Sequence, residues 1–224
     1  MNTLKLLFFF GCCLSGVPVF AQTIDDTWTL EEERANTRVY LRTNTDQLKE
    51  VRLIATFEIG IPEILEVLND VEDYPNWVYR TMESTLIERK QDTVWQVVPT
   101  GSDELLVIDT LYYYTRSDFP WPLNDRDFVI RSWTEPAGPD GVVRSLSRGV
   151  DRPDIRPGEA TRVRVFQSDW TLIPRPDGST TVDYYLRTDP AGQIPTWITN
   201  IAIRRGPIKL IEAFERKMSG RTND

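Results

Sequence analysis

The sequence lacks histidine altogether, and its only two cysteines, Cys12 and Cys13, lie close to the amino terminus. Imidazole is the side chain most often used for general acid–base catalysis near neutral pH. Without it a Ser-His-Asp triad is excluded. Without cysteine beyond Cys13, the rest of the chain has no Cys nucleophile, Cys/His zinc site or disulfide. This composition counts against an enzyme, and we expect no metal ion or other cofactor.

Positive charge is scarce as well, because 26 basic residues stand against 34 acidic ones and give a net charge of −8. A protein with this balance is not suited to general binding of a phosphate backbone. The densest basic segment, Arg144–Arg164, is interrupted by Asp151, Asp154 and Glu159, which is typical of a solvated hairpin with long loops. We therefore expect no nucleic-acid partner.

Internal repeats, low-complexity tracts and Gly/Ser linkers are also missing, so nothing marks a boundary between domains. The length that follows residue 21 is that of one domain with its own core. We expect a single domain over residues 22–224 and a monomeric protein.

The first 21 residues, MNTLKLLFFFGCCLSGVPVFA, form a unit of their own. The apolar run Leu6–Leu14 is too short to span a bilayer and has no stop-transfer pattern. Val19-Phe20-Ala21 has the spacing of a signal-peptidase site and precedes the polar Gln22. The pattern predicts a signal peptide over residues 1–21 and a periplasmic or secreted protein.

The next part of the chain combines short helices with a hairpin. Thr27–Arg34 has a Thr cap, early acidic residues and a later Arg, which predicts a short helix. Arg38–Thr43 and Glu50–Ile59 should form a hairpin, because apolar and polar residues alternate along the second segment. Ile61–Asn69 should be a helix with proline in its first turn, and Tyr74–Tyr79 a second short turn.

The sequence is then β-rich as far as residue 188 and helical at its end. The expected strands are Thr81–Arg89, Thr93–Pro99, Glu104–Arg116, Arg126–Thr134, Val142–Arg148, Thr161–Ile173 and Thr180–Thr188. Short connections between successive strands make neighbours antiparallel. Apolar residues recur at helical spacing from Ile194 to Met218, and Gly206-Pro207 should kink or break that helix. The sequence thus predicts an α+β fold, in which the terminal helix covers a long antiparallel sheet.

Two segments carry a family resemblance. FPWPLNDRDFV at residues 119–129 has a proline-aromatic-proline unit, a turn, and an Arg-Asp-aromatic start to a strand. TDPAGQIPTW at residues 188–197 precedes the predicted terminal helix. Both segments resemble those of START domains, the StAR-related lipid-transfer family. In the segment before the terminal helix, START domains commonly have the sequence Asp-Pro-Gly-Gly. Here Ala191 replaces one glycine. The resemblance extends over essentially all of residues 22–224.

The resemblance implies a helix-grip fold, in which a curved antiparallel sheet wraps around the long C-terminal helix and encloses an apolar cavity. It implies that a lipid or another hydrophobic small molecule is bound there and carried without chemical turnover, with transient membrane contact. A cyclase- or aromatase-like enzyme of the wider superfamily is the alternative. It would need an acid and a base in the cavity, for which Asp109, Tyr residues and Arg126 are the candidates. A third alternative is a domain with a filled core that only binds a partner.

Strand alternation and the resemblance together select candidate ligand-binding residues. They are Asp109, Tyr113, Arg126, Phe128, Ile130, Tyr184, Trp197, Ile198 and Ile201. One or two of Tyr112, Tyr113 and Tyr114 should face the interior, because both faces of that strand are apolar. On the terminal helix, Trp197, Ile198 and Ile201 share the face expected to cover the sheet.

Charged residues in this region allow more than one interpretation. Asp109 lies in an otherwise apolar strand, so it should face water or pair with a cation such as Arg126. Arg126 and Asp127 can also form a structural pair that anchors a loop, and we favour this interpretation. Several START domains carry an inward Arg where this sequence has Ser132, and the departure argues against a charged anchor for a ligand head group.

The signal peptide can be tested on secreted material. Sequencing of its amino terminus should give Gln22 as the first residue, because cleavage is expected after Ala21. A chain that begins at a lipid-modified Cys12 would contradict this prediction. It would identify a lipoprotein instead, although Phe9-Phe10-Gly11 is a poor match to a lipobox.

Overall fold

The structure is a computed structural model that describes residues 24–221 except 26, 35, 47, 98–102, 159 and 193. Side chains are described for the same residues apart from 94–106, 196–204, 220 and 221. All statements below refer to these parts of the chain. Among them, no helix combines the length and the apolar character that a membrane span requires.

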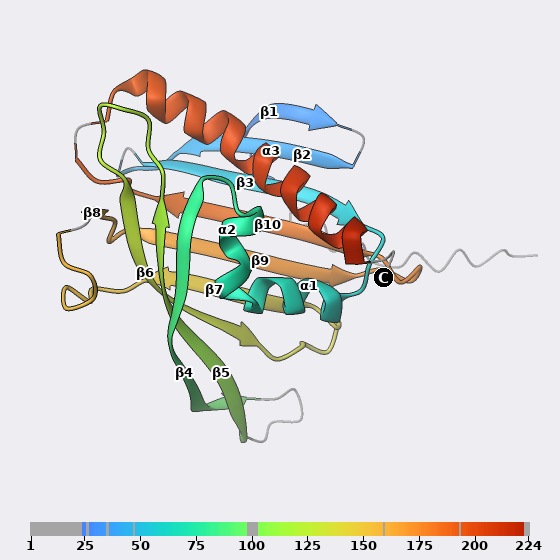
Figure 1. The fold of residues 1–224 in the computed structure, drawn as a ribbon. Coiled ribbons are helices and arrows are strands. Elements are labelled where there is room, and N and C mark those ends of the chain that lie inside the picture. The colour runs from blue at the N-terminus through green and yellow to red at the C-terminus, as the bar shows by residue number, and fades with distance from the viewer. Residues whose placement is uncertain are drawn as a thin grey trace, which may run out of the picture.

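A single large sheet dominates the described chain (Figure 1). Its strands are β1 (Thr29–Arg34), β2 (Thr37–Thr43), β3 (Lys49–Phe57), β4 (Thr81–Val97), β5 (Asp103–Ser117), β6 (Arg126–Glu135), β7 (Val143–Gly149), β8 (Thr161–Arg162), β9 (Phe166–Pro174) and β10 (Thr180–Thr188). The order across the sheet is β1-β2-β3-β10-β9-β7-β6-β5-β4, with β8 paired to β6. All pairs are antiparallel except that of β8 with β6.

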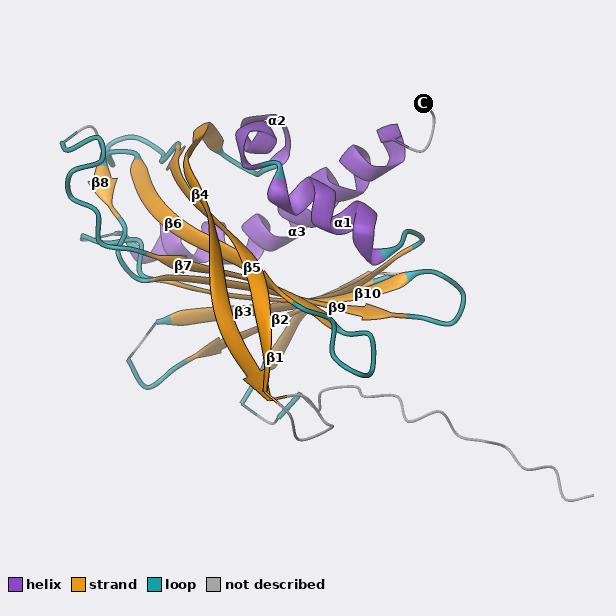
Figure 2. Cartoon of the chain, turned by 90° about the horizontal axis from the view of Figure 1, so that it is seen from below, coloured by secondary structure: helices purple, strands orange, loops and turns teal. Residues whose placement is uncertain are grey.

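The helices lie together on one side of this sheet (Figure 2). They are α1 (Ile61–Asn69), the short 3-10 helix η1 (Val71–Asp73), α2 (Tyr74–Trp77) and α3 (Thr196–Arg221). The curved sheet and its C-terminal helix confirm the α+β fold expected from the sequence. Because the sheet twists and curls towards the helices, one face is concave and covered while the other faces outward.

Alternation along the strands supplies the core. In β3, Val51, Leu53, Ala55 and Phe57 are buried and pack beneath the helices, together with Leu172 and Val182 of the adjoining strands. In α3, Ile211, Phe214 and Met218 are buried at helical spacing and contact the same cluster. The apolar face of α3 and the concave face of the sheet therefore form one core.

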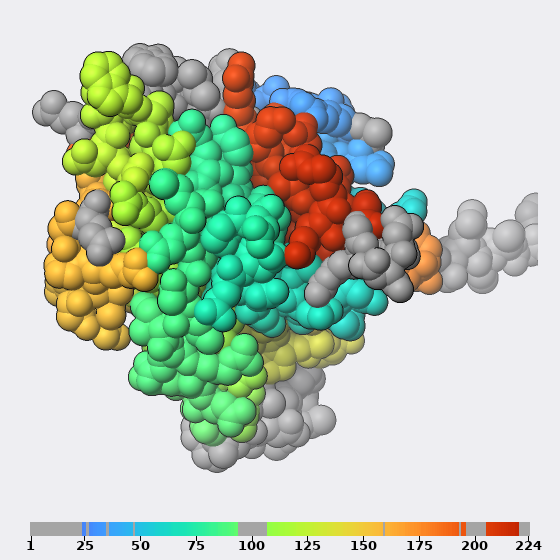
Figure 3. All heavy atoms as spheres, viewed as in Figure 1, coloured from blue at the N-terminus to red at the C-terminus, as the bar shows by residue number. Residues whose placement is uncertain are grey.

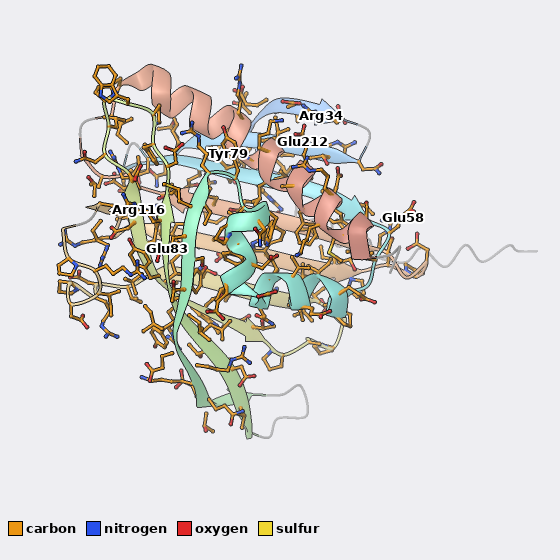
Figure 4. All side chains as sticks on the ribbon, in the orientation of Figure 1. Arg34, Glu58, Tyr79, Glu83, Arg116 and Glu212 are labelled. Carbon is orange, nitrogen blue, oxygen red and sulfur yellow. The ribbon has the colours of Figure 1, made fainter. Side chains whose placement is uncertain are left out.

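Phe214 is at the centre of that core. Its ring lies 5.1 Å from the ring of Phe57, and 5.6 Å from the rings of both Trp77 and Trp170. One side chain of α3 thus contacts β3, β9 and α2 at the same time. An ion pair at the surface also connects β1 to α3. Arg34 and Glu212 point towards each other (Figure 4), with Nη1 of Arg34 2.8 Å from Oε1 of Glu212.

The helix predicted over Thr27–Arg34 is wrong, because Thr29–Arg34 forms the edge strand β1. It pairs with β2, and Glu33 forms an ion pair with Arg38 across the hairpin. The helix prediction used the local order of acidic and basic residues. Pairing with the strand that follows directly in sequence overrides that weak preference.

Two strand boundaries also differ from the predictions. Thr81–Val97 is one continuous strand rather than two, because Gln91 and Asp92 pair directly with Asp109 and Ile108 of β5 instead of forming a turn. Conversely, the strand predicted over Thr161–Ile173 is divided. Its first two residues form β8 beside β6, and β9 begins at Phe166.

The predicted break at Gly206-Pro207 is not observed, since α3 is helical from Thr196 to Arg221 with Pro207 inside it. Proline removes one backbone hydrogen bond within a helix and crowds the preceding turn. Here Pro207 is buried, and Ile211 and Phe214 anchor the following turns in the core. We infer that this packing keeps the helix continuous.

The central position of Phe214 can be tested by truncation. We expect Phe214→Ala to lower the free energy of unfolding by about 3–5 kcal/mol, because it removes ring contacts to three elements and leaves a cavity. Arg216→Ala, at an exposed position on the same helix, should change it by no more than about 0.5 kcal/mol. Chemical denaturation measures both, and equal effects would contradict the assignment.

Candidate functional site

A cavity of about 510 Å³ lies between the concave face of the sheet and the segments that cover it. Its walls come from β3, β5, β6, β7, β9 and β10 on one side, and from α2, α3 and the loop before α3 on the other. On the face shown in Figure 3, atoms of α3 lie directly against those of the segment from α1 to β4. The cavity is thus bordered by the same elements that bury the core, and it opens to the surface on one side.

Most of the wall is apolar and aromatic. The apolar lining residues include Val51, Leu68, Trp77, Phe128, Phe166, Trp170, Leu186, Ile194, Pro207 and Leu210. Phe128 and Phe166 meet edge to face with their ring centroids 5.3 Å apart. Trp170 lies 4.7 Å from Tyr184 and also contacts Phe214, so one wall of the cavity is continuous with the core.

Hydroxyl groups form the main polar part of the wall. The group called here the hydroxyl cluster comprises Tyr74, Tyr113, Ser132, Ser147, Ser168 and Tyr184. All of its members except Ser132 line the cavity, and Ser132 accepts a hydrogen bond of 3.0 Å from Ser147.

The tyrosines of this cluster stay neutral. Burial raises the pKa of Tyr184 to about 12, and it raises the pKa of Tyr74 and of Tyr113 above the ordinary value. Removal of these phenols from water penalises the charged phenolate, so each remains protonated near neutral pH. The cluster therefore presents hydrogen-bond donors and acceptors without charge.

Three lining residues also reach the surface. Lys49, Tyr79 and Gly192 are exposed, and they mark the rim of the cavity together with the half-buried Phe119. Tyr79 lies just before β4 (Figure 4). The ammonium group of Lys49 donates a hydrogen bond of 2.7 Å to the Thr43 hydroxyl.

Arg126 ties two loops together beside this rim. Its guanidinium donates hydrogen bonds to the carbonyl oxygens of Pro190 at 2.6 Å and Ala191 at 3.1 Å, and a further one to that of Asn124. The same group lies over the ring of Phe119, 4.6 Å from its centroid. Arg126 thus joins the β5–β6 loop to the loop before α3.

Arg126 and Asp127 do not pair with each other. Asp127 is buried and forms an ion pair of 2.9 Å with Arg162 of β8. The predicted ion pair between Arg126 and Asp127 is therefore wrong. The predicted structural role agrees with the contacts, because each of the two residues anchors a neighbouring segment. The two neighbours point to opposite faces of β6, as strand geometry requires, and each anchors a different segment.

Among the predicted ligand-binding residues, Tyr113, Phe128 and Tyr184 line the cavity. Of the three consecutive tyrosines, Tyr114 is buried on the other face of β5, where Arg156 lies over its ring. Tyr112 faces outward beside Lys90. Whether Tyr113, Phe128 and Tyr184 contact a ligand stays a prediction.

Three other candidates lie elsewhere. Asp109 is exposed, beside a shallow surface groove that Leu65 of α1 also borders. It has the same strand parity as Tyr113, but β5 extends past the region that the helices cover. Ile130 shares the face of Phe128 and is buried in a cluster with Val71 and Tyr113, but it is not among the residues that line the cavity. Arg126 is next to the rim rather than among the lining residues.

The candidates on the terminal helix cannot be placed in the same way. Trp197, Ile198 and Ile201 belong to α3, but their side chains lie outside the described residues, as does the side chain of Trp95. The segment over residues 1–21 lies outside them as well.

Other lining residues were not selected from the sequence. Phe166, Ser168 and Trp170 alternate along β9 and share one face, so the period of two did carry a signal. Ser147 had no such signal, because its position opposite Ser132 and Ser168 depends on the register of three strands. Among the described residues there is no group of three or more His, Cys, Asp or Glu side chains that could hold a metal ion.

Comparison with known proteins agrees with this architecture. A family model for the START domain matches residues 21–220. The chain is 25% identical over 199 residues to an uncharacterized protein of Pseudomonas aeruginosa, covering 88% of this chain and 89% of the relative. It is 25% identical over 185 residues to the phosphatidylcholine transfer protein of Rattus norvegicus, covering 80% and 78%.

Solved structures share the fold. A STAR-related lipid transfer protein from Xanthomonas axonopodis superposes with a TM-score of 0.70 at 24% identity, over 87% of this chain and 99% of that one. A more distant neighbour is an aromatase/cyclase from Streptomyces, with a TM-score of 0.50 at 15% identity, over 78% and 96%. Since the family model covers nearly all of the described residues, this chain is a member of the START domain family.

Proposed function

We propose that the protein binds one hydrophobic molecule in the cavity and carries it between membranes without changing it chemically. The observation that carries the proposal is the cavity of about 510 Å³, bounded by aromatic and aliphatic side chains. Pockets of roughly 300–1,000 Å³ with a few polar groups are typical of small-molecule sites. Burial of the ligand against these walls supplies the retention, at about 25 cal/mol per Å² of apolar surface.

The names of related proteins support this proposal. The rat relative is a phosphatidylcholine transfer protein, and the Xanthomonas structure is a STAR-related lipid transfer protein. We extend from them only the class of cargo, a lipid or similarly hydrophobic molecule. The signal-like pattern of residues 1–21 leads us to propose that the protein works outside the cytoplasm.

A cyclase-like enzyme remains the alternative, because an aromatase/cyclase shares the fold. Its acid–base candidates are Asp109, Arg126 and the tyrosines of the cavity. Asp109 is exposed outside the cavity, and the guanidinium of Arg126 is bound to backbone carbonyls beside the rim. Tyr113 and Tyr184, whose pKa values are raised by burial, are poor bases near neutral pH. These positions favour carriage over catalysis.

The exposed ring of Trp121 supports transient membrane contact. Trp121 is 89% exposed in the loop that follows β5, and Phe119 of the same loop is at the rim of the cavity. Tryptophan partitions well into the interface between headgroups and acyl chains. Since the protein is acidic, attraction to anionic lipids would not bring it to a bilayer. We therefore propose that insertion of Trp121 places the rim at the membrane surface.

Occupancy of the cavity is the first test of the proposal. Native mass spectrometry of the protein, purified directly or after incubation with lipid vesicles, should show one bound hydrophobic molecule per chain. Leu210→Trp fills part of the cavity from α3 and should remove that molecule. Arg216→Trp places the same ring at an exposed position of α3 and should leave it bound. An empty protein under both conditions, or an equal load in both variants, would refute carriage in this cavity.

Membrane contact is tested separately. Trp121→Ser should reduce flotation of the protein with phosphatidylcholine vesicles several-fold, because it removes the apolar anchor beside the rim. Val107→Ser is the matched control, since Val107 is 62% exposed near the other end of β5. Thermal melting should be unchanged in both variants. Equal flotation of the two variants would rule out Trp121 as the contact.

A further inference from the structure

The serines of the hydroxyl cluster form a row across the sheet. Ser132 of β6 is directly opposite Ser147 of β7, and Ser147 is directly opposite Ser168 of β9. Side chains in directly paired positions share one face of a sheet, so all three hydroxyls lie on the concave face. The small size of serine leaves space at this level of the sheet, and its hydroxyl makes that space polar.

Two tyrosines extend this row at its ends. Tyr113 of β5 lies against Tyr74, with their ring centroids 5.7 Å apart, and its hydroxyl is close to that of Ser147. The hydroxyl of Tyr184 on β10 is close to that of Ser168. Tyr74 in turn donates a hydrogen bond of 2.6 Å to the backbone carbonyl of Leu68. The result is a set of hydroxyls anchored at one end by a carbonyl acceptor. Because every hydroxyl can donate or accept, the set can adjust to a ligand oxygen of either kind.

The described part of the cavity wall has almost no formal charge to pair with a charged ligand. Of the described lining residues, Lys49 alone carries a formal charge, and its side chain is exposed at the rim with its ammonium bound to Thr43. An ionised head group among the hydroxyls would be removed from water without a counter-ion, which disfavours its binding. A neutral hydroxyl or carbonyl costs far less there, because it exchanges water for the hydroxyls of the wall.

The volume is consistent with such a ligand. A volume of about 510 Å³ is in the range of small-molecule sites and suits a single-chain or polycyclic molecule. Phe128, Phe166 and Trp170 adjoin the hydroxyl cluster and supply apolar contact for the body of such a molecule.

Resting on the proposed function, we propose a specific class of cargo. It is an uncharged single-chain or polycyclic molecule whose hydroxyl or carbonyl oxygen lies against the hydroxyl cluster. Long-chain alcohols, esters and sterol-like molecules belong to this class, and ionised fatty acids and phospholipids do not.

A matched series of ligands tests the class. Dibrominated stearyl alcohol, the methyl ester of dibrominated stearic acid, and the ionised acid share one chain and differ in polar group and charge. Bromine quenches the fluorescence of nearby tryptophans, and Trp77 and Trp170 line the cavity. We expect the alcohol and the ester to bind at least tenfold more tightly than the ionised acid, a difference of about 1.4 kcal/mol.

A variant tests the hydroxyl cluster itself. Tyr113→Phe keeps the ring and removes one hydroxyl, so it should weaken binding of the alcohol about fivefold. Tyr112→Phe makes the same change on the outer face of β5 and should leave the affinity unchanged. The ligand series on the unaltered protein does not depend on how well either variant folds.

The outcomes separate this inference from the proposed function. Equal affinities for all three ligands, or tightest binding of the ionised acid, would overturn the neutral class while carriage itself would stand. An equal loss in Tyr112→Phe and Tyr113→Phe would overturn the role of the hydroxyl cluster. Failure of all three ligands to bind, in a protein that also carries no molecule after purification, would overturn both proposals.

Discussion

The structure depends on the burial of the concave face of the sheet under its helices. A curved sheet of this size leaves an apolar face that no neighbouring strand can cover, so α3 supplies the other half of the core together with α1 and α2. Phe214 makes that contact, because its ring meets β3, β9 and α2 at once. Trp77 and Trp170, two of its partners, also line the cavity. The contacts that stabilise the fold therefore hold the walls of the site in place.

The cavity itself is unusual for a protein interior, where side chains pack to the density of organic crystals and leave few voids. A volume of about 510 Å³ persists because rigid elements frame it and its serines are too small to fill it. An unfilled cavity of this kind lowers stability, since its lining loses dispersion contacts. A ligand that restores those contacts stabilises the folded state by mass action, which links binding to stability in this chain.

Much of the fold could be predicted from the sequence, and the failures have physical causes. Alternation located β3, β6 and β10, because a buried face imposes a period of two. The segment TLEEER was mistaken for a helix, since its charges suit a helix start while its real partner is the next strand. For Asp109 the alternation left both faces possible, because both are apolar, and the sequence does not say where the helices stop covering β5. The row formed by Ser132, Ser147 and Ser168 could not be predicted from the sequence, since it exists only when β6, β7 and β9 pair in this register.

The segment FPWPLNDRDFV fixes the loops beside the rim of the cavity. Its Arg126 and Asp127 point to opposite faces of β6, so one residue holds the loop before α3 while the other holds β8. The buried guanidinium of Arg126 takes three backbone carbonyls as its partners. A carboxylate partner would have needed a second buried charge with a desolvation cost of its own. The described hydrogen-bond partners of Arg126 are thus carbonyl oxygens, in keeping with a cavity whose described polar lining is nearly all uncharged. The rim is therefore fixed by hydrogen bonds to backbone, and selectivity for the ligand is left to the hydroxyls within.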